Sequence, residues 1–478
     1  MPQLHDSGNR LAGPAAHRDD TARIFGLETE YGISVSGARI DAAQVAMLMF
    51  QPMVRSERST NTYVDNGSRL YLDVGAHPEV ATAEARTPRD MMVCDGAGEL
   101  IMRAMALEAQ ERLHRDHPQA RIHVFKNNLD SAGNSCGCHE NYLVRRRVPL
   151  KAIETQLLPF LISRQIYTGA GHTDGRAWTY TQRAGVVDET VSSATTRSRP
   201  MVNTRDEPHA DPDSFRRLHV IIGDSNRSQW ATMMKAATTH YVLCAMEWSA
   251  RTGEANGLEG IALADPITAN LAVDAQGPDA QLGLADGSHA TALELQLRIL
   301  DVVENFAARH PLVDGHDFDG VLGQWRWVLG LLADRDLPAL AHVVDWACKR
   351  VTIEGIRKRR HLSEAQVRQL DLDYHDVANG ALYESLLAHG RMRTLAGADE
   401  LERAVHEPPR RTRAVLRGRF VQEARRARAR FSCDWTALHV QEPFRQSVTL
   451  LDPFDDRGDA QCRALLDRLA ALPATCET

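Results

Sequence analysis

The 478-residue chain lacks a long hydrophobic run. No segment approaches the roughly 20 consecutive apolar residues that a membrane-spanning helix requires, and the first 22 residues are polar. We therefore expect no secretory leader and no membrane partner. The eight cysteines are scattered along the chain, so we expect reduced thiols in a cytoplasmic protein.

The chain also lacks an excess of positive charge. Lysine and arginine together number 56 against 63 acidic residues, which gives a formal net charge of −7. Proteins that coat nucleic acids usually carry a net positive charge, so we expect no nucleic-acid partner. Lysine itself is rare, and nearly all basic residues are arginine. A GC-rich genome is the simplest cause of this bias, and arginine also binds phosphate well.

Several familiar motifs are absent. The sequence has no Gly-x4-Gly-Lys-Ser/Thr loop and no Gly-x-Gly-x-x-Gly after a predicted strand, which excludes the P-loop and Rossmann classes. Cys136, Cys138 and His139 lack a second cysteine pair at zinc-site spacing, so a zinc site has weak support. The arginine-rich segment 410–430 contains few aromatic residues, which favours a solvated or anion-facing helix over a single-strand binding surface.

The hydrophobic pattern predicts an α+β protein. We expect a flexible tail over residues 1–21, a large domain over 22–405 and a small C-terminal domain over 406–478, with two consecutive prolines marking the second boundary. The predicted strands cover residues 23–35, 68–74, 121–126, 141–146, 435–440 and 447–451. The predicted helices cover residues 41–55, 94–114, 230–250, much of 291–385, and 412–430. Residues 270–290 are rich in small and polar residues and predict an exposed connection.

Acidic residues on two predicted strands form the first candidate site. Glu28 and Glu30 are two positions apart, so their side chains project from the same face of a strand. Tyr71 and Asp73 have the same spacing on another strand, and Glu79 follows shortly after. Neighbouring carboxylates raise each other's pKa unless a cation compensates them. Mg²⁺ prefers oxygen ligands and accompanies nucleotide phosphates. A solvated strand face is the better explanation of one such pair alone, but two acidic strands beside arginine- and histidine-rich segments count against it.

A cationic stretch forms the second candidate site. Arg205 lies in a turn-like segment, and Arg217 and His219 share one face of a following strand. Arginines beside an acidic metal site suit phosphoryl transfer, because guanidinium groups stabilise the negative charge of the transition state. A structural salt bridge for Arg205 and a hydrogen-bonded core position for His219 are the alternatives.

Six segments together resemble the Pup ligase and Pup deamidase family. The first two are IFGLETEYG at 24–32 and NGSRLYLDVGAHPE at 66–79. The others are KNN to HENY at 126–142, NTRDEPHAD with RRLHVIIGDSN between 203 and 226, QLDLDYHD at 369–376 and TRAVLRG at 412–418. The resemblance covers about residues 22–455, and no single short motif carries it.

The resemblance implies a glutamine synthetase-like carboxylate–amine ligase fold. Such a fold has a large domain with a curved, mainly antiparallel sheet backed by helices, and here a small C-terminal α/β domain follows. The implied activity uses ATP and Mg²⁺ to phosphorylate the C-terminal glutamate of the small protein Pup. A lysine of a target protein then attacks the acyl phosphate, and the resulting isopeptide bond marks that protein for the proteasome.

The same resemblance implies roles for individual residues. Asp73 would be the base that deprotonates the lysine, because a lysine with its usual pKa of about 10.4 is protonated at neutral pH. Metal binding would fall to Glu28, Glu30, Tyr71 and Glu79. Nucleotide or phosphate contacts would come from Arg205, Arg217, His219, Arg417 (or Arg413) and Trp435, with Trp435 against the adenine.

Two other activities stay open. The family also contains a depupylase, which hydrolyses the same bond and in which Asp73 would act as nucleophile or activate water. The segment 192–200 and the short stretch between Tyr31 and Tyr71 resemble the ligase branch. A ligase for a small carboxylate and an amine is the second alternative.

Overall fold

The computed structural model describes residues 21–73, 75–129, 135–192, 199–310 and 320–473. Of the predicted tail, only Thr21 is among them. Val74, at the end of the predicted strand 68–74, and residues 193–198 of the ligase-like segment lie outside the described residues.

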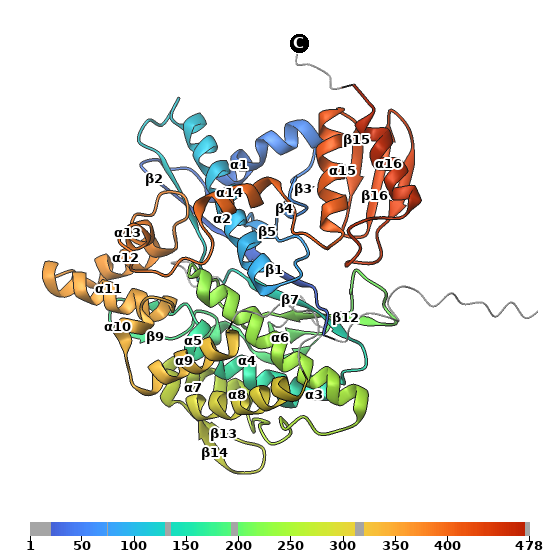
Figure 1. Ribbon diagram of the computed structural model, residues 1–478. Helices are drawn as coiled ribbons and strands as arrows, with labels where there is room; N and C mark the ends of the chain where they lie inside the picture. Colours follow the sequence, from blue (N-terminus) through green and yellow to red (C-terminus); the bar gives the residue numbers. More distant parts are fainter. Residues whose placement is uncertain (1–20, 74, 130–134, 193–198, 311–319, 474–478) are drawn as a thin grey trace, which may run out of the picture.

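An eight-stranded sheet lies at the centre of the structure (Figure 1). Its strand order is β10-β11-β12-β7-β1-β5-β4-β3, and only β10 and β11 run parallel. The strands are β1 (Phe25–Glu30), β3 (Asn61–Tyr63), β4 (Arg69–Leu72), β5 (Pro78–Ala81), β7 (Cys138–Arg145), β10 (Glu189–Ser192), β11 (Pro200–Asn203) and β12 (Phe215–Val220). The expected α+β class with a large, mainly antiparallel sheet is therefore confirmed.

One face of this sheet is apolar and the other is polar. In β1, Phe25, Leu27 and Thr29 are buried and alternate with half-buried residues, as the sequence pattern predicts. The apolar face packs on helices that share one hydrophobic core with it. These helices are α4 (Leu158–Ser163), α5 (Gln165–Thr168), α6 (Gln229–Thr252), α7 (Pro266–Gln276), α8 (Ala292–Arg309) and α9 (Val321–Ala333). The polar face carries the acidic residues of β1 and β5.

The predicted strand 23–35 divides into two strands. β1 ends at Glu30, and after the fully buried Tyr31 the chain enters β2 (Gly32–Ser36), which pairs with β6 (Arg121–Phe125) in a separate sheet. Both strands pack against α1 (Ala42–Glu57) and α2 (Pro88–Leu113) in a second core. The sequence pattern does not show this break, because the alternation of buried and less buried residues continues through Tyr31 while the backbone passes from one sheet to the other.

The remaining elements are mostly short. They are α3 (Leu150–Ala152), η2 (Ile153–Leu157), β8 (His172–Thr173), β9 (Trp178–Thr179), η3 (Ala184–Val186), η4 (Gly277–Asp279), β13 (Gln281–Gly283), β14 (His289–Thr291), α10 (Leu337–Leu340), α11 (Asp345–Arg360), α12 (Glu364–His375), α13 (Leu382–Ala388) and α14 (Ala398–His406). No helix within the described ranges is both long and apolar enough to cross a membrane.

The prediction of an exposed connection over 270–290 was wrong. This segment contains the end of α7 and the hairpin of β13 and β14, and Val273 and Leu282 are fully buried in the main core. Asp265 caps α7 by accepting hydrogen bonds from two backbone N–H groups. Its alanines and glycines occupy both buried and exposed positions, so composition alone did not reveal the hairpin.

The C-terminal residues form a small three-stranded antiparallel sheet covered by two helices (Figure 1). Its elements are α15 (Ala414–Arg426), β15 (Arg430–Cys433), β16 (Ala437–Glu442), β17 (Gln446–Thr449) and α16 (Ala460–Ala470). These elements share a core that also includes Tyr63 of β3. The domain limits at residues 21/22 and 405/406 stay predictions.

Candidate active site

Sheet register brings the predicted acidic residues together on the polar face. In the pairing of β1 with β5, Glu30 lies opposite Glu79, and in the pairing of β1 with β7, Glu28 lies opposite His139. Tyr71 of β4 lies opposite Glu79. Residues far apart in the sequence thus form two neighbouring rows on one face of four adjacent strands: His139 beside Glu28, and Glu30 beside Glu79 and Tyr71.

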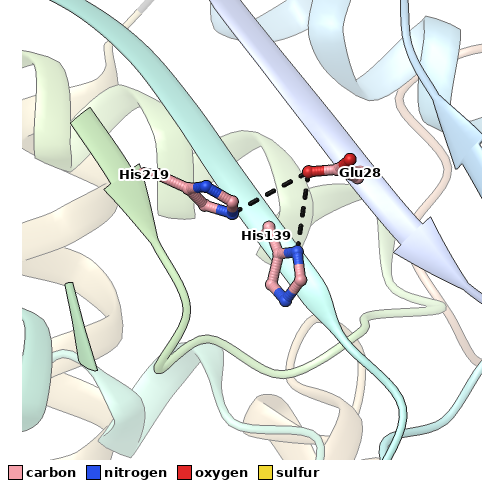
Figure 2. A group of neighbouring side chains, drawn as sticks. All are labelled: Glu28, His139 and His219. Atoms are coloured by element: carbon pink, nitrogen blue, oxygen red, sulfur yellow. Dashed lines mark ion pairs between the residues drawn. The ribbon is translucent and has the colours of Figure 1, made fainter. Parts of the chain in front are cut away.

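Glu28 is the centre of the first group (Figure 2). The Tyr71 hydroxyl donates a hydrogen bond of 2.5 Å to Glu28 Oε1. On the other side, Glu28 Oε2 lies 3.6 Å from His139 Nδ1 and 3.8 Å from His219 Nε2. The two imidazole rings meet edge to face, with centroids 4.8 Å apart. The ligand atoms of these three residues lie within 4.8 Å of one another, which is close enough to hold one cation.

Glu30, Glu79 and His139 form a second group of the same compactness. Glu30 Oε2 also accepts a hydrogen bond of 2.7 Å from the backbone N–H of Gly137. Of the residues that the structure describes, these two groups are the ones with metal-binding geometry, and neither includes a cysteine. Their carboxylate oxygens suit hard cations such as Mg²⁺ and Mn²⁺, while imidazole suits transition metals such as zinc.

The electrostatics of the groups show why a cation fits. Glu79 is only 2% exposed. Burial, followed by the charges of Glu28 and Glu30, raises its pKa to about 10. Burial also acts to raise the pKa of Glu28, but hydrogen bonds and charge from His139 and the Tyr71 hydroxyl hold it well below its usual range. A divalent cation would supply the positive charge that Glu79 lacks among its described neighbours, and would favour the ionised form of Glu79.

Burial also determines the protonation of His219. Desolvation, with smaller effects from His139 and Arg217, lowers the pKa of His219 to about 3. The imidazole is therefore neutral at physiological pH, the form that ligates a metal or donates one hydrogen bond to phosphate.

Asp73 lies on a tight turn directly after β4. Its backbone N–H donates to His77 O at 3.0 Å, and its carbonyl accepts from Ala76 N–H at 3.1 Å. Gly75 and Ala76 have positive φ angles of 95° and 62°. The Asp73 charge contributes to the raised pKa of Glu79, which places its carboxylate within electrostatic range of the acidic groups. The turn thus presents Asp73 at the end of the polar sheet face.

A cavity continues from the acidic groups toward the C-terminal unit. Glu28, Asn141 and Arg217 line its sheet side, while Pro208, His209 and Trp435 line the opposite side. Arg217 is held in place because Nη1 donates to Asn141 Oδ1 at 3.0 Å and Nε donates to Glu207 O at 3.1 Å. The cavity therefore combines a fixed cation, an acidic end and an aromatic ring.

Arg205 and Arg417 lie outside this arrangement. Arg205 is exposed and pairs with Glu207 at 2.5 Å. Arg417 is completely buried: it donates to both oxygens of Glu84 and to the carbonyl oxygens of Gly67 and Trp435. Its guanidinium also lies 4.8 Å from the Trp435 ring centroid. This geometry makes Arg417 a support for Trp435, so its direct nucleotide contact, like that of Arg205, stays a prediction.

Arg413, the alternative to Arg417, joins three segments at the cavity wall. It donates to Glu84 Oε1 at 2.7 Å, to His209 O at 2.6 Å and to Leu450 O at 2.8 Å. Glu84 thus lies between two buried arginines of the segment that begins α15, and it connects the central sheet to the C-terminal unit.

Sequence reasoning missed His139 and His209 as site residues. His139 was considered only as part of a cysteine-rich zinc motif, although it stands two positions before Asn141 on one strand face. His209 has a positive φ angle of 48°, which no sequence pattern predicts. Its position depends on the loop that Arg413 holds.

We expect the Glu84→Gln substitution to destabilise the fold by roughly 3–5 kcal/mol at pH 7, because it leaves two buried guanidinium groups poorly compensated. The charges of Arg417 and Arg413 outweigh burial and lower the pKa of Glu84 to about 2. A lowered pKa means that the stabilisation is present above the unfolded pKa of about 4.3 and is lost as pH falls toward 2. Chemical denaturation from pH 7 to pH 3 measures it.

The control is Glu423→Gln, which removes a solvated pair with Arg426 on the same helix. Such a pair contributes about 0.5 kcal/mol or less. A Glu84→Gln variant with the stability of the parent, or a difference that does not shrink in acid, would contradict the expectation.

Together, the fold and the site define an α+β protein with an acidic, metal-compatible group and a cation-lined cavity on one sheet face. The family model described as "Pup-ligase protein" matches residues 23–439. The chain is 58% identical to "Pup--protein ligase" of Bifidobacterium animalis subsp. lactis (strain AD011), with 98% of each chain covered. It is 56% identical to the same-named protein of Bifidobacterium dentium, with 98% of this chain and 100% of that protein covered.

Two solved structures are similar over nearly the whole length. The complex between the prokaryotic ubiquitin-like protein Pup and its ligase PafA aligns with a TM-score of 0.87 at 35% identity, covering 94% of this chain and 91% of that one. The Pup ligase PafA in complex with ADP aligns with a TM-score of 0.79 at 34% identity, covering 92% and 97%. The chain belongs to the Pup-ligase family.

Proposed function

We propose that this chain is an ATP-dependent ligase that joins the C-terminal glutamate of Pup to lysines of target proteins. The observation that supports the proposal most strongly is the grouping of Glu28, Glu30, Glu79 and Tyr71 on one sheet face, beside a cavity lined by Arg217 and Trp435. The relatives named above are Pup ligases, and the two similar solved structures are of PafA with Pup and with ADP. The proposal extends these partners to this chain.

The acidic groups would hold Mg²⁺, which neutralises phosphate charge when bound. Glu28, Glu30 and Glu79 supply the carboxylate oxygens, and Tyr71 fixes the orientation of Glu28 through its hydroxyl. The buried, uncompensated carboxylate of Glu79 supports this assignment. Neutral His219 lies beside Glu28, where it would contact the metal or a phosphate oxygen.

The reaction would proceed in two steps at this sheet face. The Pup carboxylate attacks the γ-phosphorus of ATP, and ADP leaves while Arg217 stabilises the developing negative charge. Asp73 then accepts a proton from the lysine ammonium, and the neutral amine attacks the acyl carbon and expels phosphate. The exposed Arg205 would contact phosphate only after movement away from Glu207.

The nucleotide base would stack on Trp435, which Arg417 and Tyr63 support from behind. Replacing Trp435 with alanine should raise the KM for ATP about tenfold, because base–aromatic stacking contributes roughly 1–3 kcal/mol, and should change kcat little. Steady-state kinetics at varied ATP concentration measure both constants.

Trp435→Phe should keep most of the affinity, and Trp327→Ala serves as the matched control because Trp327 is exposed on α9. If Trp435→Ala lowers kcat at an unchanged KM, the adenine assignment is wrong.

The ligase activity itself is tested by incubation with Pup, ATP, Mg²⁺ and a lysine-bearing protein. A mass increase of the target by one Pup, minus water, with release of ADP, is the expected result. Release of free Pup from a purified conjugate instead would identify a depupylase. ADP release with small carboxylates, but not with Pup, would identify a ligase for a different substrate.

We also propose the cytoplasm as the location of this activity. The described cysteines are all free, and most are buried, as expected where thiols stay reduced.

A further inference from the structure

The backbone beside the acidic groups is held by residues that the reaction scheme does not use. Between β6 and β7 the structure describes residues 126–129 and 135–137, and in this loop Leu129 and Ser135 lie opposite each other. The loop returns to the sheet through Cys136 and Gly137, and the Gly137 N–H donates to Glu30 Oε2 at 2.7 Å. One peptide group thus fixes one oxygen of a proposed metal ligand.

The carbonyl of this same peptide group faces a buried cation. Arg183 Nη1 donates to the Cys136 carbonyl oxygen, and Asn128 Nδ2 donates to it at 3.0 Å. The carbonyl and the N–H of one peptide point in opposite directions. The guanidinium, the peptide dipole and the Glu30 carboxylate therefore form one aligned chain, in which each hydrogen bond polarises the next.

Within the described ranges, Arg183 makes this carbonyl contact and no salt bridge. Its side chain is only 3% exposed, and its Nε has no hydrogen-bond partner among the described residues. Glu30 is the largest favourable charge acting on it. Among the described residues no carboxylate forms an ion pair with Arg183, and a buried cation is costly without favourable contacts, so the Cys136 carbonyl and the Glu30 charge are the interactions that stabilise it there.

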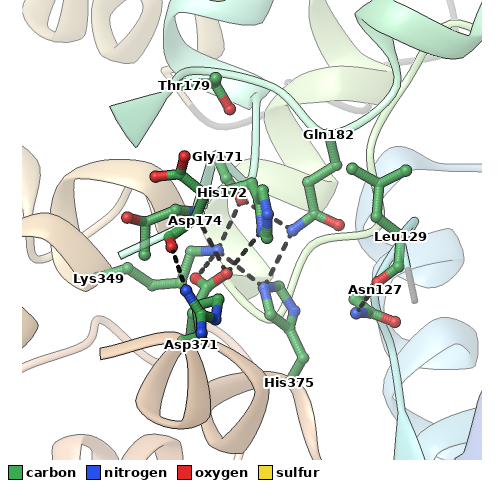
Figure 3. Close-up of polar contacts among 12 residues, drawn as sticks. Asn127, Leu129, Gly171, His172, Asp174, Thr179, Gln182, Lys349, Asp371 and His375 are labelled. Atoms are coloured by element: carbon green, nitrogen blue, oxygen red, sulfur yellow. Dashed lines mark hydrogen bonds and ion pairs between the residues drawn. The ribbon is translucent and has the colours of Figure 1, made fainter. Parts of the chain in front are cut away.

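The neighbouring residue Gln182 holds the other end of the loop. Its Oε1 accepts from Asn128 N–H at 2.6 Å, and its Nε2 donates to Gly171 O at 2.8 Å and lies 3.2 Å from His375 Nε2. Figure 3 shows that Gln182 and His375 belong to a larger buried network.

In that network, the ammonium of Lys349 anchors the side chains that face Gln182. Lys349 pairs with Asp371 at 2.7 Å and lies 3.0 Å from His375 Nε2, to which it donates. The imidazole must therefore be neutral, with its Nδ1–H donating to Lys126 O at 2.9 Å. The family-like segment 369–376 thus supports the loop through Gln182 rather than contacting the acidic groups.

The site also leaves no room for a different residue at Gly137. A Cβ atom there would lie 2.5 Å from His139 Nε2 and 2.9 Å from Glu30 Oε1. The peptide passes between two candidate ligands, so its position sets the distance between them.

We propose that Arg183, assisted by Gln182 and Asn128, is a positioning residue that holds the Cys136–Gly137 peptide so that its N–H orients Glu30 for metal binding. This inference rests on the proposed function, in which Glu30 is a metal ligand. Partners that orient a ligand from behind typically change metal affinity by about 10–100-fold.

Direct titration with Mn²⁺, followed by electron paramagnetic resonance without ATP or Pup, tests the inference. Arg183→Met removes the charge and the donor at similar volume, and should raise the Mn²⁺ dissociation constant about tenfold or more. Arg183→Lys keeps the charge and should stay within about threefold of the parent, and Arg183→Gln should lie between. Arg145→Met is the control, because it removes another buried guanidinium, over the Phe215 ring, at the far end of β7.

The possible results distinguish a failure of the positioning role of Arg183 from a failure of the proposed metal site. A folded Arg183→Met variant with the parent's Mn²⁺ affinity overturns the positioning role, and if that variant does not fold, parental affinity of Arg183→Gln does so. An equal loss of affinity in Arg145→Met also overturns it. A parent protein that binds no Mn²⁺ overturns the proposed metal site itself, and the inference with it.

Discussion

Replacing Asp73 with asparagine should lower the rate of Pup ligation to lysine by about 10²–10⁴-fold while ATP affinity stays close to that of the parent. Asparagine has nearly the same shape but cannot accept a proton, so the lysine ammonium would stay protonated and unreactive. Among the described residues, the turn that holds Asp73 is closed by backbone hydrogen bonds, so the substitution should leave the fold intact. Ligation is measured by mass shift, and ATP affinity by equilibrium binding.

A nucleophile that is already neutral tests the formation of the acyl phosphate separately from the deprotonation of lysine. Hydroxylamine is largely unprotonated at neutral pH, so it can trap an acyl phosphate without a base. The Asp73→Asn variant should therefore still form hydroxamate from Pup, ATP and Mg²⁺ at a rate near that of the parent. Loss of hydroxamate together with ligation would show that Asp73 acts in carboxylate phosphorylation instead, and full ligation by the variant would contradict the base assignment.

The alternating pattern predicted the acidic face of β1 correctly, because period-two alternation determines which side chains share a face. It could not predict that Glu30 lies opposite Glu79, since strand register depends on turns and core packing far from both residues. His139 entered the site through the pairing of β7 with β1, which joins segments more than one hundred residues apart. The other candidate site residues were predicted from the resemblance to the family, and not from the hydrophobic periodicity.

The burial of individual charged side chains was the property that could be predicted least well from the sequence. Arg417 and Arg205 both stand in arginine-rich segments, yet one is fully buried and the other is more than half exposed. The difference arises from Glu84, a carboxylate more than three hundred residues before α15, which forms ion pairs with Arg413 and Arg417. The small-residue segment 270–290 was misassigned for the same reason: close packing and exposure produce similar compositions.

The Glu79→Gln substitution should abolish ligation, with an expected loss of at least about 10³-fold, while it stabilises the metal-free protein. The activity falls because one carboxylate of the metal-binding groups is lost, and that charge is needed to hold Mg²⁺ against the nucleotide phosphates. The stability rises because Glu79 is almost fully buried beside Glu28 and Glu30. Because its pKa is raised to about 10, Glu79 must take up a proton when the metal-free protein folds at neutral pH, and a neutral glutamine avoids that cost.

Thermal unfolding with and without Mg²⁺ separates these effects from general damage. In EDTA, Glu79→Gln should unfold at a higher temperature than the parent, whereas added Mg²⁺ should stabilise the parent more than the variant, since a ligand stabilises only the state that binds it. Glu189→Gln, at an exposed position at the start of β10, is the control and should match the parent in both conditions. A Glu79→Gln variant that is less stable than the parent in EDTA would mean that Glu79 is compensated within the protein itself, and the acidic groups would then have no need of a cation.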